Sequence, residues 1–250
     1  MSITETVSQL TIPGPKIDPG RRLDLFAGYS FGWPACVGTA TPYLRGCLTT
    51  PRYAARVAKE VSCPVMLDNG AWSDFVNSRH RLLMDVVEDL IDAYETIGPD
   101  RVRWVVAPDK VGRGFLSDRR ACEGSQWLNA KAIPGYKVLW PIQEGMSLEN
   151  PFCFYKYGLV GGFFIGGKTR RWKFEMSKCI RRHLPKVHIH IGRISSLVHL
   201  QHAVSIGVNS FDTTTYSRQN NWNRRQDFSD TLEGYCNLSD EEWISRVGYY

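Results

Sequence analysis

Several common features are missing from this sequence of 250 residues. No apolar run approaches the roughly 18 residues that a membrane-spanning helix needs. The first residues, MSITETVSQLTIPGPKIDPG, contain no charged segment followed by an apolar run, which excludes a typical signal peptide. We therefore expect a cytoplasmic protein with a flexible leader at residues 1–20 and one domain over residues 21–250.

Metal and cofactor motifs are also missing. The seven cysteines are scattered and include no CxxC pair, which argues against a disulfide framework or a zinc knuckle. No GxGxxG opens a helix after the first apolar run, and no Walker A lysine motif is present. His188 and His190 share one strand face, but no carboxylate has the spacing to complete a metal site with them. We expect neither a metal nor a cofactor.

The net charge of +6 permits a polyanionic partner without requiring one. The distribution of the cations is more informative, because they gather in the last third of the chain near Trp172 and Trp222. Such clusters also occur on solvated helix faces, but together they favour contact with nucleic-acid phosphates. The candidate phosphate-binding residues are Lys168, Arg170, Arg171, Lys173, Arg218, Arg224 and Arg225.

Apolar runs of strand length alternate with longer amphipathic stretches along the chain. The predicted strands are 23–28, 63–70, 102–112, 137–145, 158–167, 187–193 and 208–217. The predicted helices are 51–61, 79–98, 118–130, 171–183 and 195–207. Strands that are apolar throughout indicate a parallel sheet buried on both faces. Seven such units without a linker favour an α/β fold of the (β/α)8 TIM-like barrel type, with an open doubly wound sheet as the alternative.

Polar residues close four of the predicted strands: Asp68, Asp109, Gln143 and Asp212. A fifth strand ends in glycines, Gly161 and Gly162 followed by Gly166 and Gly167. A single aspartate at a strand end often caps the next helix. Because barrel enzymes carry their chemistry at the carboxyl ends of the strands, several such residues predict one shared site.

These strand ends resemble the tRNA-guanine transglycosylase superfamily in order and spacing. LDNGAW is similar to its D-S-G-G-[FY]-Q motif, WPIQEG to G-[IV]-x-Q-G, and VGGFFIGG to [IV]-G-G-L-[AS]-V-G. The block from HIGRISS to FDTTTYSR is similar to the segment that carries the family's last aspartate. The resemblance extends from Leu67 to Arg218. Four weak motifs in the right order make a fairly specific signal.

The sequence also departs from the family's tRNA enzymes. Those enzymes carry a zinc site after the last block, whereas only Cys236 and no histidine lies beyond Asp212 here. The chain is also shorter. Both departures resemble the compact DpdA-type relatives, often encoded by phages, which insert 7-deazaguanine derivatives such as preQ0 into DNA. The resemblance thus implies a pentosyltransferase without the zinc subdomain, with DNA and a free 7-deazaguanine base as its partners.

The resemblance also implies a role for each residue. Asp212 is the expected nucleophile and Asp68 the general acid/base, although the sequence leaves these two roles exchangeable. The expected base-binding residues are Asp109, Gln143, Gly161, Gly162, Trp72 and Ile191. Trp72 would stack on the base, although its position also fits a core aromatic. Asp109 would accept hydrogen bonds from the Watson–Crick edge of guanine, which distinguishes guanine from adenine.

Three other interpretations remain open on the sequence. The same chemistry on tRNA is one, and a non-catalytic nucleic-acid-binding barrel is the second. The third is a small-molecule barrel enzyme such as an aldolase-like lyase, for which Lys110 is the candidate Schiff-base residue.

Overall fold

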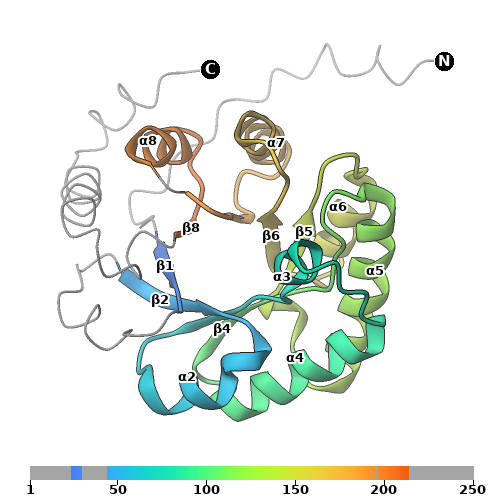
Figure 1. Cartoon of the computed structure of the whole chain (residues 1–250). Coiled ribbons are helices and arrows are strands. Elements are labelled where there is room, and N and C mark those ends of the chain that lie inside the picture. Colours follow the sequence, from blue (N-terminus) through green and yellow to red (C-terminus); the bar gives the residue numbers. More distant parts are fainter. Residues whose placement is uncertain (1–23, 30–43, 195, 214–250) are drawn as a thin grey trace.

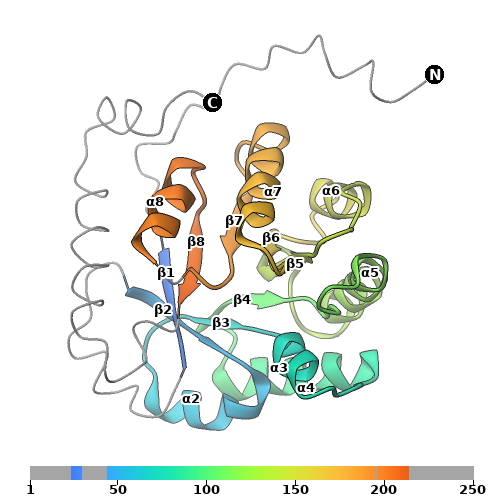
Figure 2. The same cartoon turned by 45° about the horizontal axis from the view of Figure 1, so that its top comes forward.

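The computed structural model describes residues 24–29, 44–194 and 196–213 of the chain. Eight parallel strands close into a barrel in chain order, as Figures 1 and 2 show. The first and last strands pair with each other, with Phe26 beside Asp212. The predicted (β/α)8 TIM-like barrel is therefore confirmed, and the alternative of an open sheet is excluded.

The strands are short, and their carboxyl ends all open at the same end of the barrel. They are β1 (Asp24–Gly28), β2 (Leu44–Thr49), β3 (Val65–Leu67), β4 (Val102–Val106), β5 (Val138–Ile142), β6 (Gly162–Ile165), β7 (His188–Ile191) and β8 (Ser210–Thr213).

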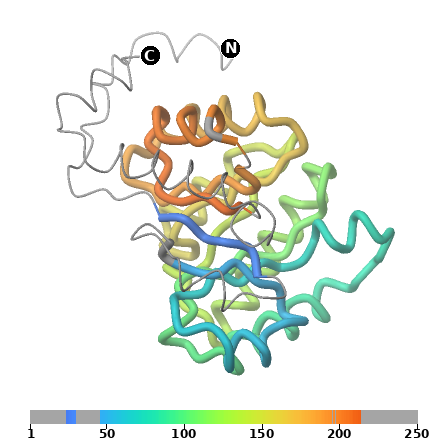
Figure 3. The backbone as a smooth tube through the Cα atoms, turned by 60° about the vertical axis from the view of Figure 1, so that its left-hand side comes forward, coloured from blue at the N-terminus to red at the C-terminus, as the bar shows by residue number. Residues whose placement is uncertain are grey.

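Helices surround the barrel in a ring (Figure 1), and Figure 3 shows α7 and α8 on the opposite side from α2 and α4. The described α-helices are α2 (Ala54–Glu60), α3 (Ala71–Val76), α4 (Leu83–Ile97), α5 (Gly114–Lys131), α6 (Glu149–Lys156), α7 (Arg170–His183) and α8 (Leu197–Ser205). Two short 3-10 helices are η1 (Pro51–Tyr53) and η2 (Gly135–Lys137). None of the helices in these ranges is long and apolar enough to cross a membrane.

Two hydrophobic layers hold the barrel together. Inside it, the buried side chains of Phe26, Met66 and Leu139 pack against one another. A larger cluster, which includes Ile189 and Phe211, fills the space between the strands and the helices. The layers alternate along each strand because successive side chains point to opposite faces.

Strand β2 and helices α3 and α6 were not expected from the sequence. β2 contains Arg45 and Gly46, so it lacks the apolar character of the other strands. A Cβ at Gly46 would lie 2.5 Å from the Phe26 ring, so the glycine makes room for this large side chain inside the barrel. Gly46 therefore weakens the apolar pattern of β2 in the sequence, although the packing of Phe26 inside the barrel requires a glycine there.

Candidate active site

Three carboxylates from different strands meet at the carboxyl end of the barrel. Asp68 directly follows β3, Asp109 lies just beyond β4, and Asp212 is near the end of β8. The negative charges on Asp109 and Asp212 both raise the pKa of Asp68, which places the three groups in one site. The convergence predicted from the strand ends is thus present.

Asp68 titrates near neutral pH. Its pKa rises from 3.8 to about 7, mainly because burial penalises the charged form and then because of the charges on Asp109 and Asp212. Its Oδ1 accepts a long hydrogen bond of 3.4 Å from the backbone N–H of Gly70, which favours the charged form only weakly. The carboxyl group can therefore both donate and accept a proton near pH 7.

Asp109 is held by two neighbouring amides. The Nδ2 of Asn69 donates to Oδ1 of Asp109 at 3.0 Å, and the Nε2 of Gln143 donates to Oδ2 at 2.5 Å. Burial raises the pKa of Asp109 to about 6, although both hydrogen bonds oppose the rise. A carboxylate has about four lone-pair sites, so two remain for a ligand.

Asn69 is a site residue that the sequence reasoning missed. It is buried, and its Nδ2 also donates to the carbonyl of Ala107 at 2.6 Å. Its Oδ1 accepts from the backbone N–H of Ala71 at 2.7 Å, at the start of α3. Asn69 therefore couples the start of α3 to the carboxylate of Asp109. The only signal in the sequence was its position between Asp68 and a glycine.

Gln143 is fixed at both ends of its amide. Its Oε1 accepts the backbone N–H of Gly167 at 3.0 Å, while its Nε2 holds Asp109. A Cβ at Gly166 would overlap the amide, so this position has to be a glycine for Gln143 to lie where it does. One amide hydrogen of Gln143 is used by Asp109, which leaves the second for a ligand.

Asp212 is supported from below by a hydrogen-bonded network. Its Oδ2 lies 3.1 Å from Nε2 of the fully buried His190, whose Nδ1 lies 2.9 Å from the hydroxyl of Ser210. The same hydroxyl lies 2.9 Å from Nε2 of His188. Because a carboxylate needs a donor, we assign the proton of His190 to Nε2, and the Ser210 hydroxyl then donates to Nδ1.

The network explains the pair of histidines in β7. His188 and His190 do share one strand face, as the sequence indicated, and His190 faces the barrel interior, with its ring stacked on Phe164. The direct contact of His190 with Asp212 was missed because it depends on the pairing of β7 with β8.

Lys173 is a correction to the predicted phosphate-binding residues. It lies on α7 but is buried, and its Nζ donates to the carbonyl of Gly192 at 2.7 Å. Burial lowers its pKa to about 8, against the opposing attraction of Asp212. The side chain therefore lies beneath the site, because it follows the inner face of α7, and it is not available to a nucleic-acid backbone.

Trp72 lies at the mouth of the barrel and not in the core. Its side chain is 39% exposed, and the guanidinium of Arg193 lies over its ring at 4.0 Å. Trp72 belongs to α3, after β3, whereas Arg193 follows β7 on the opposite side of the barrel. In Figure 1, α3 accordingly lies inside the ring formed by the other helices. The pair bridges the opening above the three carboxylates.

Gly161 and Gly162 are wrongly placed by the sequence prediction. Strand β6 begins at Gly162, and the N–H of Gly161 donates to the carbonyl of Val138, where β5 begins. Both glycines therefore lie at the amino end of the barrel, away from the carboxylates. Gly166 and Gly167 follow the apolar core of this strand in the chain, so they lie at its carboxyl end.

Ile191 is the other correction among the expected base-binding residues. It is fully buried in the cluster between the strands and the helices. Its neighbour His190 faces the interior instead, and successive strand residues alternate. Ile191 therefore cannot cover the face of a bound base.

The remaining predicted residues divide into two groups. Lys168, Arg170 and Arg171 are exposed where α7 begins, and Nζ of Lys168 lies 5.1 Å from the ring centre of Phe75 on α3. Arg218, Arg224 and Arg225 lie outside the described residues. So does the predicted leader at residues 1–20.

Within residues 24–29, 44–194 and 196–213, no three histidine, cysteine, aspartate or glutamate side chains are grouped to hold a metal ion.

Comparisons with known proteins do not assign the chain to a family. No protein-family model matches the chain, and no curated protein has a significantly similar sequence. The function of the site therefore has to be inferred from its own geometry and chemistry.

Proposed function

We propose that the protein is a base-exchange transglycosylase that replaces guanine in DNA with a 7-deazaguanine base such as preQ0. The observation that carries this proposal is the meeting of Asp68, Asp109 and Asp212 at the mouth of the barrel, where the pKa of Asp68 is about 7. Base exchange needs three groups: a nucleophilic carboxylate, a proton donor beside it, and a group that binds the base. Asp212, Asp68 and Asp109 can supply them in that order.

The first half of the reaction breaks the bond between C1′ of the sugar and N9 of guanine. A carboxylate oxygen of Asp212 attacks C1′ and forms an ester, while the electron pair of the broken bond leaves with guanine. Asp68, in its protonated form, gives its proton to the departing base. The hydrogen bond from His190 keeps Asp212 oriented for attack. The backbone of the nucleic acid stays intact throughout.

The second half reverses these steps with the new base. Asp68, now ionised, takes the proton from N9 of the incoming 7-deazaguanine. That nitrogen attacks C1′ and displaces the carboxylate of Asp212. Asp68 loses a proton in the first half of the reaction and regains one in the second. The exchange therefore needs no reactant besides the nucleic acid and the incoming base.

Selectivity for guanine follows from Asp109. With its two remaining lone-pair sites, this carboxylate can accept from both N1–H and the 2-amino group of guanine. Adenine offers no such pair of donors and would leave a buried carboxylate without partners, which is strongly unfavourable. Asn69 and Gln143 hold the carboxylate in position, and the free amide hydrogen of Gln143 can donate to O6.

DNA is the proposed polymer because the sequence resembles the compact DpdA-type relatives. The exposed cations where α7 begins support contact with the phosphates of a nucleic acid. A target base has to leave the stack to reach the mouth of the barrel, at a cost of a few kcal/mol. The face of Trp72 that Arg193 covers would then stack on the base, after Arg193 moves aside.

The proposal is tested by incubating the full chain with preQ0 and either DNA or tRNA, followed by digestion to nucleosides and mass spectrometry. We expect modified deoxyguanosine from DNA and none from tRNA. Asp212→Asn should reduce exchange by at least about 10³-fold, because the nucleophile is lost. Asp100→Asn is the matched control, since Asp100 is exposed at the amino end of the barrel. Exchange that survives Asp212→Asn would refute the mechanism, and modification of tRNA alone would refute the choice of DNA.

A further inference from the structure

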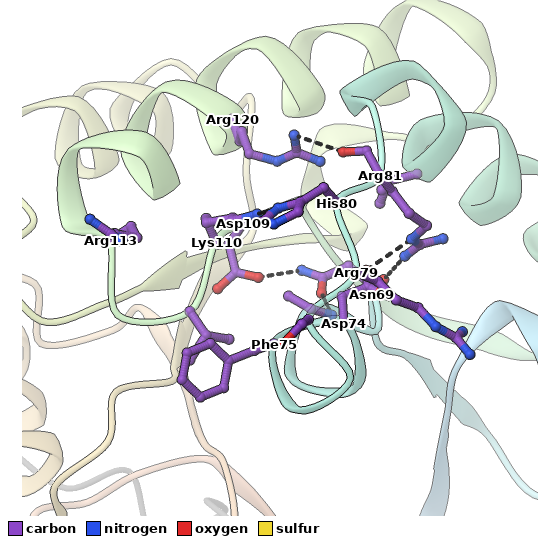
Figure 4. Close-up of a pocket in the computed structure, with 14 residues that line it drawn as sticks. Asn69, Asp74, Phe75, Arg79, His80, Arg81, Asp109, Lys110, Arg113 and Arg120 are labelled. Atoms are coloured by element: carbon purple, nitrogen blue, oxygen red, sulfur yellow. Dashed lines mark hydrogen bonds and ion pairs between the residues drawn. The ribbon is translucent and has the colours of Figure 1, made fainter.

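A cationic pocket lies beside the three carboxylates, between α3 and the loop that joins β4 to α5 (Figure 4). Its volume is about 230 Å³, and Asn69 and Asp109 form the wall that faces the candidate active site. The basic residues that line it are Arg79, His80, Arg81, Lys110, Arg113 and Arg120. None of these cations was predicted to bind a phosphate.

Only one of these arginines is neutralised by carboxylates. Nε of Arg81 lies 2.9 Å from Asp74, and its Nη1 lies 2.6 Å from Asp89. Within the part of the chain that the structure describes, Arg79, Lys110, Arg113 and Arg120 form no ion pair with a carboxylate. The basic side chains that line the pocket therefore outnumber its two carboxylates, Asp74 and Asp109, which leaves an excess of positive charge.

Arg120 is the most informative of these cations. It is partly buried, and its Nε is a buried donor that has no hydrogen-bond acceptor among the described residues. Its Nη1 makes only a long hydrogen bond of 3.4 Å to the carbonyl of Arg81. Burial lowers its pKa, and the positive charge of Arg81 adds to this effect, against the attraction of Asp109, Asp74 and Glu123. A guanidinium held in this way would gain strongly from a bound anion.

Lys110 and His80 add a second donor. Nζ of Lys110 lies 3.0 Å from Nδ1 of His80. Because an ammonium group only donates, Nδ1 has to accept, and the proton of the neutral imidazole is then on Nε2.

We propose that this cationic pocket binds a phosphate group, namely a phosphodiester next to the base held by Asp109. The assignment to a nucleic-acid strand rests on the proposed function, because Asp109 and Asn69 line both the pocket and the base site. The binding of a phosphate group rests only on the cations. Lys168 lies beside this pocket, because its Nζ is 5.1 Å from the ring centre of Phe75 in the pocket lining, so a phosphate here would extend the cationic surface where α7 begins.

The test measures binding without catalysis. The full chain carrying Asp212→Asn is titrated with a fluorescent single-stranded oligonucleotide that contains one guanine, and anisotropy gives the dissociation constant. Arg113→Gln should weaken binding by about tenfold and reduce the slope of log K against log salt by about 1. Arg120→Gln should do the same. Arg119→Gln is the matched control, because Arg119 lies on the same helix, is exposed and pairs with Glu123.

A neutral methylphosphonate in place of one phosphodiester beside the guanine identifies the contact. We expect one such replacement to weaken binding as much as Arg113→Gln does, and the two losses to be non-additive when combined. If Arg120→Gln disturbs folding, as circular dichroism would show, the exposed Arg113 variant still decides the question. Fully additive losses would refute a contact between this pocket and the strand.

A titration with inorganic phosphate distinguishes a pocket that binds a phosphodiester of a nucleic-acid strand from one that binds free phosphate. Calorimetric titration of wild type with phosphate should show no binding at millimolar concentration. Phosphate binding that Arg120→Gln abolishes, with oligonucleotide affinity equal in all variants, would make the pocket a site for free phosphate and overturn its assignment to a strand. Equal affinity of every variant for both probes would overturn the proposal itself. Neither outcome depends on base exchange, so the proposed function can fail separately.

Discussion

The raised pKa of Asp68 has a consequence for stability that is independent of the reaction. An acid with a folded pKa of about 7 and an ordinary value of 3.8 binds its proton more tightly in the folded state. Well below pH 3.8 both states are protonated, and Asp68 costs nothing. As the pH rises from about 4 to 7, the folded protein loses stability, because the unfolded chain ionises first. Above pH 7 the loss is constant.

The size of this loss follows from the shift. About three pKa units at 1.36 kcal/mol each give a loss of at most about 4 kcal/mol at pH 8. Asp68→Asn removes the charge and keeps an oxygen that can accept from the N–H of Gly70. We expect the substitution to raise the free energy of unfolding at both pH 5 and pH 8. The gain should be about 2–3 kcal/mol larger at pH 8, because at pH 5 much of the loss has not yet developed.

Urea unfolding of the full chain at pH 5 and pH 8, followed by circular dichroism, measures both gains. Asp100→Asn serves as the control, because this exposed residue should give little gain at either pH. An equal effect of Asp68→Asn at the two pH values, or a loss of stability at pH 8, would refute the burial of Asp68 beside Asp109 and Asp212. The reasoning about the active site would then fail as well.

Two further predictions concern the mouth of the barrel. Trp72→Ala should weaken binding of free preQ0 by about 5- to 150-fold, because stacking on an aromatic ring is worth about 1–3 kcal/mol per base. Trp72→Phe should retain most of the affinity. Calorimetric titration measures these affinities, and an equal affinity of wild type and Trp72→Ala for preQ0 would exclude stacking. Gly166→Ala should displace the amide of Gln143 and reduce exchange by about 10²-fold, since small errors of position are costly in catalysis. A variant with unchanged melting temperature and full activity would show that Gln143 does not have to be fixed.

The residues of the candidate active site are far apart in the sequence and come from different strands of the barrel. The acid/base, the base-reading group and the nucleophile follow three different strands, β3, β4 and β8. The groups that position them are nearby in space and come from yet other elements, such as His190 on β7 and Gln143 after β5. A buried carboxylate with a raised pKa destabilises the folded state when it is ionised. Such groups are typical of catalytic sites, where proton transfer needs a pKa near the working pH.

The chain order of apolar runs and polar strand ends was enough to predict the barrel. It also predicted that Asp68, Asp109, Gln143 and Asp212 would meet, because parallel strands present their carboxyl ends at one edge. Local pattern decided these features. It could not reveal β2, in which Gly46 serves the packing of Phe26 and leaves no apolar signal.

Only the tertiary structure decided which strand residues face the barrel interior and which face the helices. The start of β6 at Gly162 places Gly161 and Gly162 at the amino end of the barrel, away from the carboxylates. Alternation along β7 turns Ile191 outward and His190 towards Asp212. The burial of Lys173 and the unpaired arginines of the cationic pocket likewise depend on neighbours far away in the chain. Sequence periodicity records which residues are apolar, whereas register and packing determine what each polar group touches.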